Sequence, residues 1–129
     1  MMNNELVNFE TAKLAKSKGF EEPCHEFHHP RNGVINDCQI RTNTYMGLPV
    51  GYGNECCTAP TQSLLQRWLR EKHGIHLQMH IMFLEFDDAV VGYNVDVIGK
   101  NHNATEFMDT FTTYEEAIEL GLMESLKML

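Results

Sequence analysis

A change in the spacing of apolar residues after residue 60 constrains the fold of this chain most. Four apolar residues of the stretch "APTQSLLQRWLREKHG" recur at helical spacing: Leu64, Leu65, Trp68 and Leu69. Over residues 75–83 and again over 91–97, apolar and polar residues alternate, which is typical of strands with one buried face. Short connections favour antiparallel pairing of such strands. The sequence therefore predicts a helix, then an antiparallel pair of strands, and a weaker third strand over residues 105–111.

Capping residues mark the ends of three predicted helices. Asn8 is placed to cap a first helix that stops at Gly19. Pro60 suits the first position of the second helix, and Gly74 suits its end. A capping box begins the third helix, "TYEEAIELGLMESLKML", and consists of Thr113 and Glu116.

The size and composition of the chain suit one globular domain. It has 129 residues, of which 43% are hydrophobic and 22% are charged, so it can bury a core without a metal or disulfides. We predict a single α+β domain over residues 1–129. In it, an antiparallel sheet of three to five strands is packed by two main helices, the second and the third. The C-terminal part has the order α-β-β-(β)-α, and an N-terminal helix and a hairpin pack at an edge.

The net charge of −8 argues against partners that select basic surfaces. Nucleic acids and anionic membranes both require clustered Lys and Arg, so we expect neither as a partner. The N-terminal stretch is polar, and no run approaches the ~18 apolar residues of a membrane span. We therefore expect an acidic cytoplasmic protein whose cysteines are reduced.

The predicted α-β-β-β-α order resembles that of double-stranded RNA-binding domains. That family contacts phosphates through a basic cluster at the start of its last helix. Here the corresponding position reads "TYEEAIEL", and residues 58–129 hold five Lys and Arg against eleven Asp and Glu. Because this surface would repel phosphate, the resemblance implies a shared topology and no binding of RNA.

Ligand-type residues gather in the segment "PCHEFHHPRNGVINDC", which spans residues 23–38. Cys24, His28 and Cys38 could hold zinc, with Cys56 or Cys57 as a fourth ligand. Strong zinc signatures contain Cys-x2-Cys knuckles, and this chain has none. A zinc-binding module is therefore one alternative, and a hairpin with small buried thiols and no cofactor is the favoured interpretation.

The Asn32-Gly33 pair predicts a two-residue turn, which fixes the strand register of this hairpin. In that register Phe27 faces Cys38, and Cys24 lies three residues from Phe27, on the other face of the hairpin. A shift of one residue would make Cys24 a diagonal neighbour of Cys38. The zinc hypothesis therefore depends on the register.

Cys57 gives another alternative, a cysteine-nucleophile enzyme. It precedes the second helix, and a helix N-terminus lowers the pKa of a thiol. The 51–53 loop would supply backbone N–H groups to a substrate. The candidate general bases are His76, His80 and His102. Against this hypothesis, Thr58 or Ala59 is the expected cap, which places the thiol beyond the strongest part of the helix dipole.

Three stretches carry a family resemblance: "NFETAKLAKSKGFEEPC", "TAPTQSLLQRWLREKHGIH" and "TYEEAIELGLMESLKML". Together they resemble a family of small uncharacterised proteins of Bacteroides-type bacteria and of their phages and prophages. The likeness spans both ends of the chain and is weakest over residues 25–55. It implies a bacterial or phage cytoplasm. No activity is established for that family, so it assigns no functional residue to this chain.

The last candidate is an interaction surface on the second helix. Its outer face carries Arg67, Arg70 and His73, while Trp68 faces inward. Arg and Trp are common anchors of protein interfaces. No catalytic or metal-binding constellation passes its geometric test, so we predict a non-catalytic cytoplasmic protein that works by protein contact. It would be an accessory protein of bacterial or phage origin, and its partner is another protein or a second copy of the chain.

Overall fold

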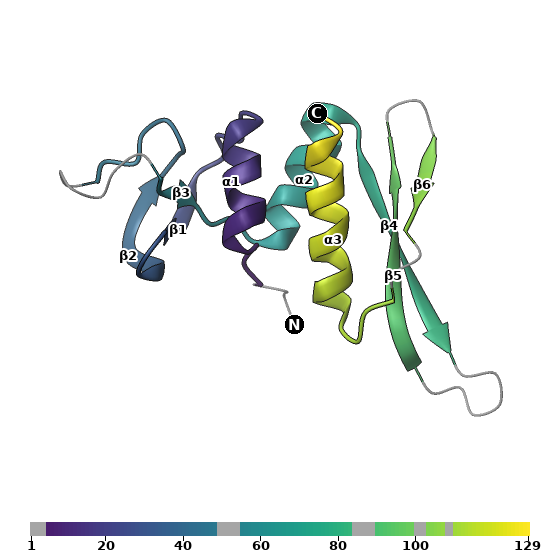
Figure 1. Ribbon diagram of the computed structural model, residues 1–129. Coiled ribbons are helices and arrows are strands. Elements are labelled where there is room, and N and C mark those ends of the chain that lie inside the picture. The colour runs from purple at the N-terminus through teal and green to yellow at the C-terminus, as the bar shows by residue number, and fades with distance from the viewer. Residues whose placement is uncertain (1–4, 49–54, 84–89, 100–102, 108–109) are drawn as a thin grey trace. The chain divides into compact units, whose positions relative to one another are not determined.

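The computed structural model describes residues 5–48, 55–83, 90–99, 103–107 and 110–129, without the side chains of residues 38, 90 and 91 (Figure 1). These residues form three helices and two antiparallel sheets, which confirms the predicted α+β class. The chain divides into two compact units, Met1–Leu65 and Gln66–Leu129. The expectation of one domain over residues 1–129 stays a prediction. None of the described helices combines the length and apolarity needed to cross a bilayer.

The first unit contains one helix and a sheet of order β2-β1-β3. Its elements are α1 (Phe9–Ser17), β1 (Cys24–His29), β2 (Gly33–Arg41) and β3 (Cys57–Thr58). The side chain of Asn8 accepts a hydrogen bond of 2.9 Å from the N–H of Thr11, which confirms the predicted cap. After α1, Gly19 adopts a φ of +90° and the N–H of Phe20 donates to the carbonyl of Ala15. The fully buried Phe20 ring anchors this end of the helix.

The β1–β2 hairpin differs from the predicted one. The two-residue Asn32-Gly33 turn was wrong, since the chain turns through residues 30–32 and His29 pairs with Gly33. The buried His29 ring explains the longer turn, because its Nδ1 accepts hydrogen bonds of 3.1 and 3.2 Å from the N–H groups of Arg31 and Asn32. Phe27 therefore faces Ile35 instead of residue 38.

An irregularity in the ladder shifts the register again near the end of this hairpin. Glu26 pairs with Asn36, whereas Cys24 pairs with Arg41. Residues 37–40 of β2 thus lie opposite the single residue His25, as in an extended β-bulge. Arg41 would also face Cys24 in the predicted register that pairs Phe27 with Cys38. The side chains before and after the irregularity, however, no longer follow one alternation.

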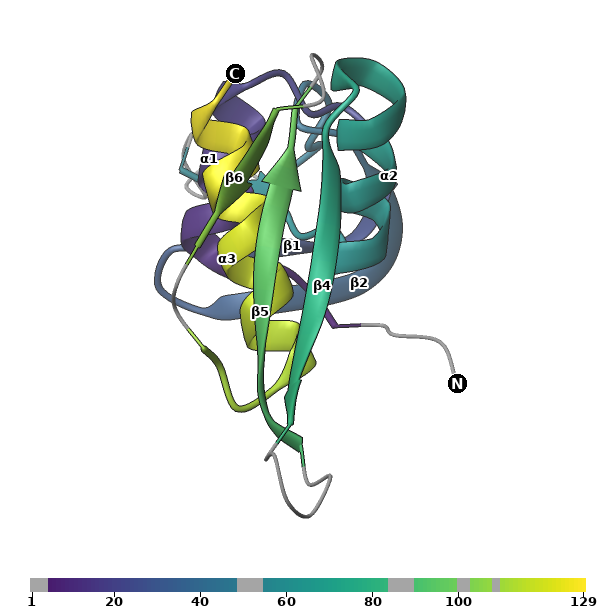
Figure 2. The ribbon, with the colours of Figure 1, turned by 90° about the vertical axis from the view of Figure 1, so that its right-hand side faces the viewer.

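The second unit has the predicted α-β-β-β-α order. It contains the end of α2 (Gln62–His73), then β4 (His76–Phe83), β5 (Val90–Ile98), β6 (Ala104–Glu106) and α3 (Tyr114–Lys127). The sheet has the order β4-β5-β6 and is antiparallel. The third strand is shorter than predicted, and Phe111 pairs with Tyr93 as an isolated bridge. Figure 2 shows α3 and the end of α2 behind one face of this sheet.

The start of α2 lies two residues later than predicted. The helix begins at Gln62, and the hydroxyl of Thr61 accepts a hydrogen bond of 3.1 Å from the N–H of Leu64. Thr61 is therefore the cap, because its hydroxyl satisfies one of the unpaired N–H groups of the first turn. Pro60, Thr58 and Ala59 precede the cap. At the other end, Gly74 has a φ of +64°, as predicted for the residue that stops the helix.

The predicted capping box forms at the start of α3. The hydroxyl of Thr113 accepts a hydrogen bond of 3.2 Å from the N–H of Glu116, as predicted. The carboxylate of Glu116 also accepts hydrogen bonds from the hydroxyls of Thr113 and Thr112. These two hydrogen bonds, the one from Thr113 first, lower the pKa of Glu116.

Close packing of α3 on the sheet depends on Gly121. A Cβ atom at this position would lie 2.9 Å from a methyl group of Val95 and 3.1 Å from both methyl groups of Leu77. Six residues form the buried face of the helix: Ala117, Ile118, Gly121, Leu122, Ser125 and Leu126. Without a side chain at Gly121, the helix backbone approaches β4 and β5 directly.

Gly121→Ala is expected to destabilise the protein by about 1 to 3 kcal/mol, because the new methyl group overpacks the α3–sheet contact. Its higher helix propensity offsets only part of this cost. Urea unfolding followed by circular dichroism measures the change. Gly99→Ala is the matched control, since the nearest atom to a Cβ there is 3.9 Å away. Equal unfolding midpoints for Gly121→Ala and Gly99→Ala would contradict the proposed contact.

Candidate functional site

The structure brings Cys57 opposite His28, across the β1–β3 pair. Side chains of paired residues lie on the same face of a sheet. This face is the one that α1 covers, because the Phe9 ring lies 5.7 Å from the His28 ring. The Nε2 atom of His28 is 2.9 Å from the carbonyl oxygen of Val7. Sequence reasoning did not consider His28 as a partner for Cys57, because only the pairing of β1 with the two-residue β3 joins them.

The surroundings of Cys57 keep it a thiol at neutral pH. It is fully buried, and burial raises the pKa of its thiol to about 11, although the nearby ammonium of Lys16 opposes the rise. A cysteine nucleophile requires a thiolate, so the burial and raised pKa of Cys57 argue against its use as a nucleophile.

The candidate bases for Cys57 lie elsewhere or outside the described part. His76 and His80 belong to β4 in the second unit, whereas Cys57 belongs to the first. His80 is already engaged, since its Nε2 atom is 2.7 Å from a carboxylate oxygen of Asp96. His102 and the 51–53 loop lie outside the described residues.

The predicted zinc ligands Cys24 and His28 lie on opposite faces of the β2-β1-β3 sheet. Thr58 pairs with Phe27, so their side chains point away from the α1 face. Cys24 shares this second face, because its ladder partner Arg41 places its guanidinium 5.1 Å from the centre of the Phe27 ring. Burial raises the pKa of Cys24 to about 11, and the Thr58 hydroxyl lowers it only in part.

The irregular ladder next to Cys24 explains this separation, because it inverts the alternation that would have put Cys24 and His28 on one face. The side chain of Cys38 lies outside the described part, so its place relative to both is not given. Over the residues that the structure describes, no three metal-ligating side chains come together. The zinc module stays a prediction that no geometry supports.

Iodoacetamide at pH 7 is expected to label Cys57 far more slowly in the folded protein than in urea, because the thiol is buried and protonated.

The pKa of Cys57 is raised on folding, so the stabilising contribution of its thiol is complete below pH 9 and is lost as the pH rises towards 11. The free energy of unfolding should therefore fall less steeply between pH 9 and 11 in Cys57→Ala than in the unchanged protein. Labelling at the rate of a free thiol would contradict this description.

The predicted interaction residues of α2 have different environments. Arg67 and Arg70 are exposed, whereas His73 is half-buried and packs edge-on against Trp68 with 4.7 Å between ring centroids. Trp68 is buried, as expected for a residue of the inward stripe. His73 thus covers the indole ring. A contact surface made of Arg67, Arg70 and His73 stays a prediction.

The edge strand β4 is a surface that sequence reasoning missed. An edge strand presents alternate N–H and C=O groups away from its neighbour, ready to pair with another chain. Over the described residues, the backbone of β4 forms ladder pairs with β5 alone. Its sequence, "HLQMHIMF", contains no proline and no Lys, Arg, Asp or Glu. It therefore lacks the residues by which natural edge strands prevent pairing.

The other described edge strands are shorter or irregular. Strand β3 has two residues and β6 has three, while β2 is interrupted opposite His25 and carries charged side chains. Strand β4 has eight residues, and its pairing with β5 is regular from His76 to Met82. It is thus the described edge best suited to accept another strand.

The end of β4 exposes large apolar side chains. Leu77 contacts α3 at Gly121, so by alternation Ile81 lies on the same face as Leu77, whereas Phe83 follows the register shift after Met82. Ile81 and Phe83 are nevertheless 50% and 57% exposed. Figure 1 shows the reason, since β4 and β5 extend past the first turn of α3. The sequence contained one signal for this edge, an eight-residue run without Lys, Arg, Asp or Glu, but it did not show the order of the strands in the sheet.

Comparison of the chain with protein-family models, with curated proteins and with solved structures gives no match. The resemblance to small proteins of Bacteroides-type bacteria and their phages therefore stays a prediction.

Proposed function

We propose that this protein works without catalysis, as a cytoplasmic accessory protein of bacterial or phage origin that binds an extended segment of another protein along β4. The single observation behind the proposal is the edge strand itself. It has eight residues, no proline and no Lys, Arg, Asp or Glu, and over the described residues it pairs on one side alone. Strand addition to such an edge is a common mode of peptide recognition.

Charge favours a different protein over a second copy of this chain. Residues 58–129 carry a net charge of −6, so two copies of this part would repel each other. A partner segment flanked by Lys and Arg would be attracted. The central residues of that segment would be apolar or β-branched, because they lie beside a strand without Lys, Arg, Asp or Glu.

The exposed apolar residues supply part of the binding energy. Backbone hydrogen bonds position the added strand, and side chains of the partner contact the exposed Ile81 and Phe83. Covering the exposed half of each of these side chains contributes about 1 kcal/mol. The His80–Asp96 pair on the other face offers polar contacts to the remaining alternate side chains.

Extended peptides that bind the whole protein can be selected from a displayed random library. Ile81→Lys is expected to weaken their binding by at least about tenfold. The substitution places a charge on the edge strand and removes an apolar contact, both of which oppose strand addition. Fluorescence polarisation of the labelled peptides measures the dissociation constant. Ile40→Lys is the matched control, since Ile40 is 66% exposed and lies on β2.

A second comparison tests the backbone pairing. Peptides carrying N-methyl groups at alternate residues lose the N–H groups that bond β4, so their binding should be abolished in one of the two alternating patterns. Peptides that bind equally well in both methylated forms would rule out strand addition. Native mass spectrometry tests for a dimer. A stable dimer that Ile81→Lys dissociates would show that the partner of β4 is a second copy of this chain and not another protein.

A further inference from the structure

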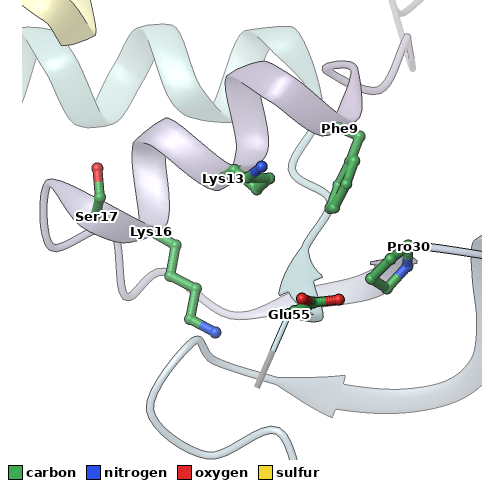
Figure 3. Close-up of a pocket in the computed structure, with 6 residues that line it drawn as sticks. All are labelled: Phe9, Lys13, Lys16, Ser17, Pro30 and Glu55. Carbon is green, nitrogen blue, oxygen red and sulfur yellow. The ribbon is translucent and has the colours of Figure 1, made fainter. Parts of the chain in front are cut away.

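A cavity of about 570 Å³ lies along α1 in the first unit (Figure 3). Three of its lining residues, Phe9, Lys13 and Lys16, follow one another at spacings of four and three, so they share one face of the helix. Pro30 of the hairpin turn and Glu55 line the cavity from other parts of the chain, and Ser17 completes the lining. A volume of this size suits a small molecule.

The two lysines give one part of the cavity a positive charge. The Nζ atom of Lys16 donates a hydrogen bond of 2.8 Å to the carbonyl of Cys56, which holds the ammonium in place. The Nζ atom of Lys13 lies 5.3 Å from the centre of the Phe9 ring. Over the described residues, no carboxylate lies within ion-pair distance of Lys13. Figure 3 shows the two ammonium groups apart, so a carboxylate that contacts both requires the exposed Lys13 side chain to turn towards Lys16.

The end of the cavity away from Lys16 holds its two apolar lining residues. Figure 3 shows Phe9 and Pro30 there, with the carboxylate of Glu55 beside Pro30. A flat ring placed at this end would bury apolar surface against both residues. Glu55 also lines the cavity, and its negative charge would oppose a ligand with more than one anionic group.

We infer that this cavity binds a small aromatic carboxylate, with its ring against Phe9 and Pro30 and its carboxylate on Lys13 and Lys16. This ligand class places a ring beside Phe9 and Pro30 and a single negative charge at the lysines, and the two Lys and one Glu of the lining have a net formal charge of +1 that this charge balances. The site lies in the first unit and is independent of the proposed strand addition on β4.

Titration of the whole protein with 3-phenylpropionate, followed by calorimetry or by ¹H–¹⁵N spectra, tests the inference. Lys13→Gln should raise the dissociation constant about tenfold, because a hydrogen bond to a charged group is lost. Lys18→Gln is the matched control, since it makes the same charge change outside the cavity lining and should change the constant less than twofold. Glu55→Gln should lower the constant, because a repulsive charge is removed.

Two analogues separate the roles of the two ends. 3-Phenylpropan-1-ol lacks the carboxylate and acetate lacks the ring, so each should bind at least tenfold more weakly than 3-phenylpropionate. The inference is overturned if 3-phenylpropionate does not bind at millimolar concentration, or if either analogue binds as well. It is also overturned if Lys13→Gln and Lys18→Gln weaken binding equally, since that would indicate diffuse attraction without a defined site.

Discussion

The distance between α3 and the β4-β5-β6 sheet is set by the missing side chain at Gly121. With only a hydrogen at that position, the helix backbone packs directly on Leu77 and Val95. This contact decides which face of the sheet is covered. Because side chains alternate along β4, it also decides that Ile81 points to the covered face, where it is nevertheless 50% exposed. The exposed apolar end of the edge strand is a consequence of this packing.

Features with a local cause could be predicted from the sequence. The cap at Asn8, the turn residues Gly19 and Gly74, and the Thr113 hydroxyl bonded to Glu116 each involve residues within four positions of one another. The alternation of apolar and polar residues along β4 and β5 is equally local, since neighbouring residues of a strand point to opposite faces and one face is buried. The α-β-β-β-α order follows from these signals together, without any knowledge of long-range contacts.

The hairpin of the first unit shows where local signals fail. Asn-Gly usually makes a two-residue turn, but the buried ring of His29 bonds two backbone N–H groups and stabilises a longer one. The irregularity opposite His25 then reverses the alternation, so Cys24 and His28 occupy different faces although both belong to β1. A set of ligand-type residues that is compact in sequence is therefore divided by the sheet.

Pairings between segments distant in sequence determine which residues meet at the candidate sites, and no sequence pattern predicted these pairings. Cys57 meets His28 because a two-residue strand pairs with β1, and strand β4 is an edge because β5 pairs with it and with β6. Composition was likewise a poor guide to the cavity along α1. The chain has a net charge of −8, yet exposed charges more than about 8 Å apart are largely screened at physiological salt. A bound carboxylate would therefore interact mainly with Lys13, Lys16 and Glu55, so an acidic chain can hold an anion at one place and attract a basic partner at another.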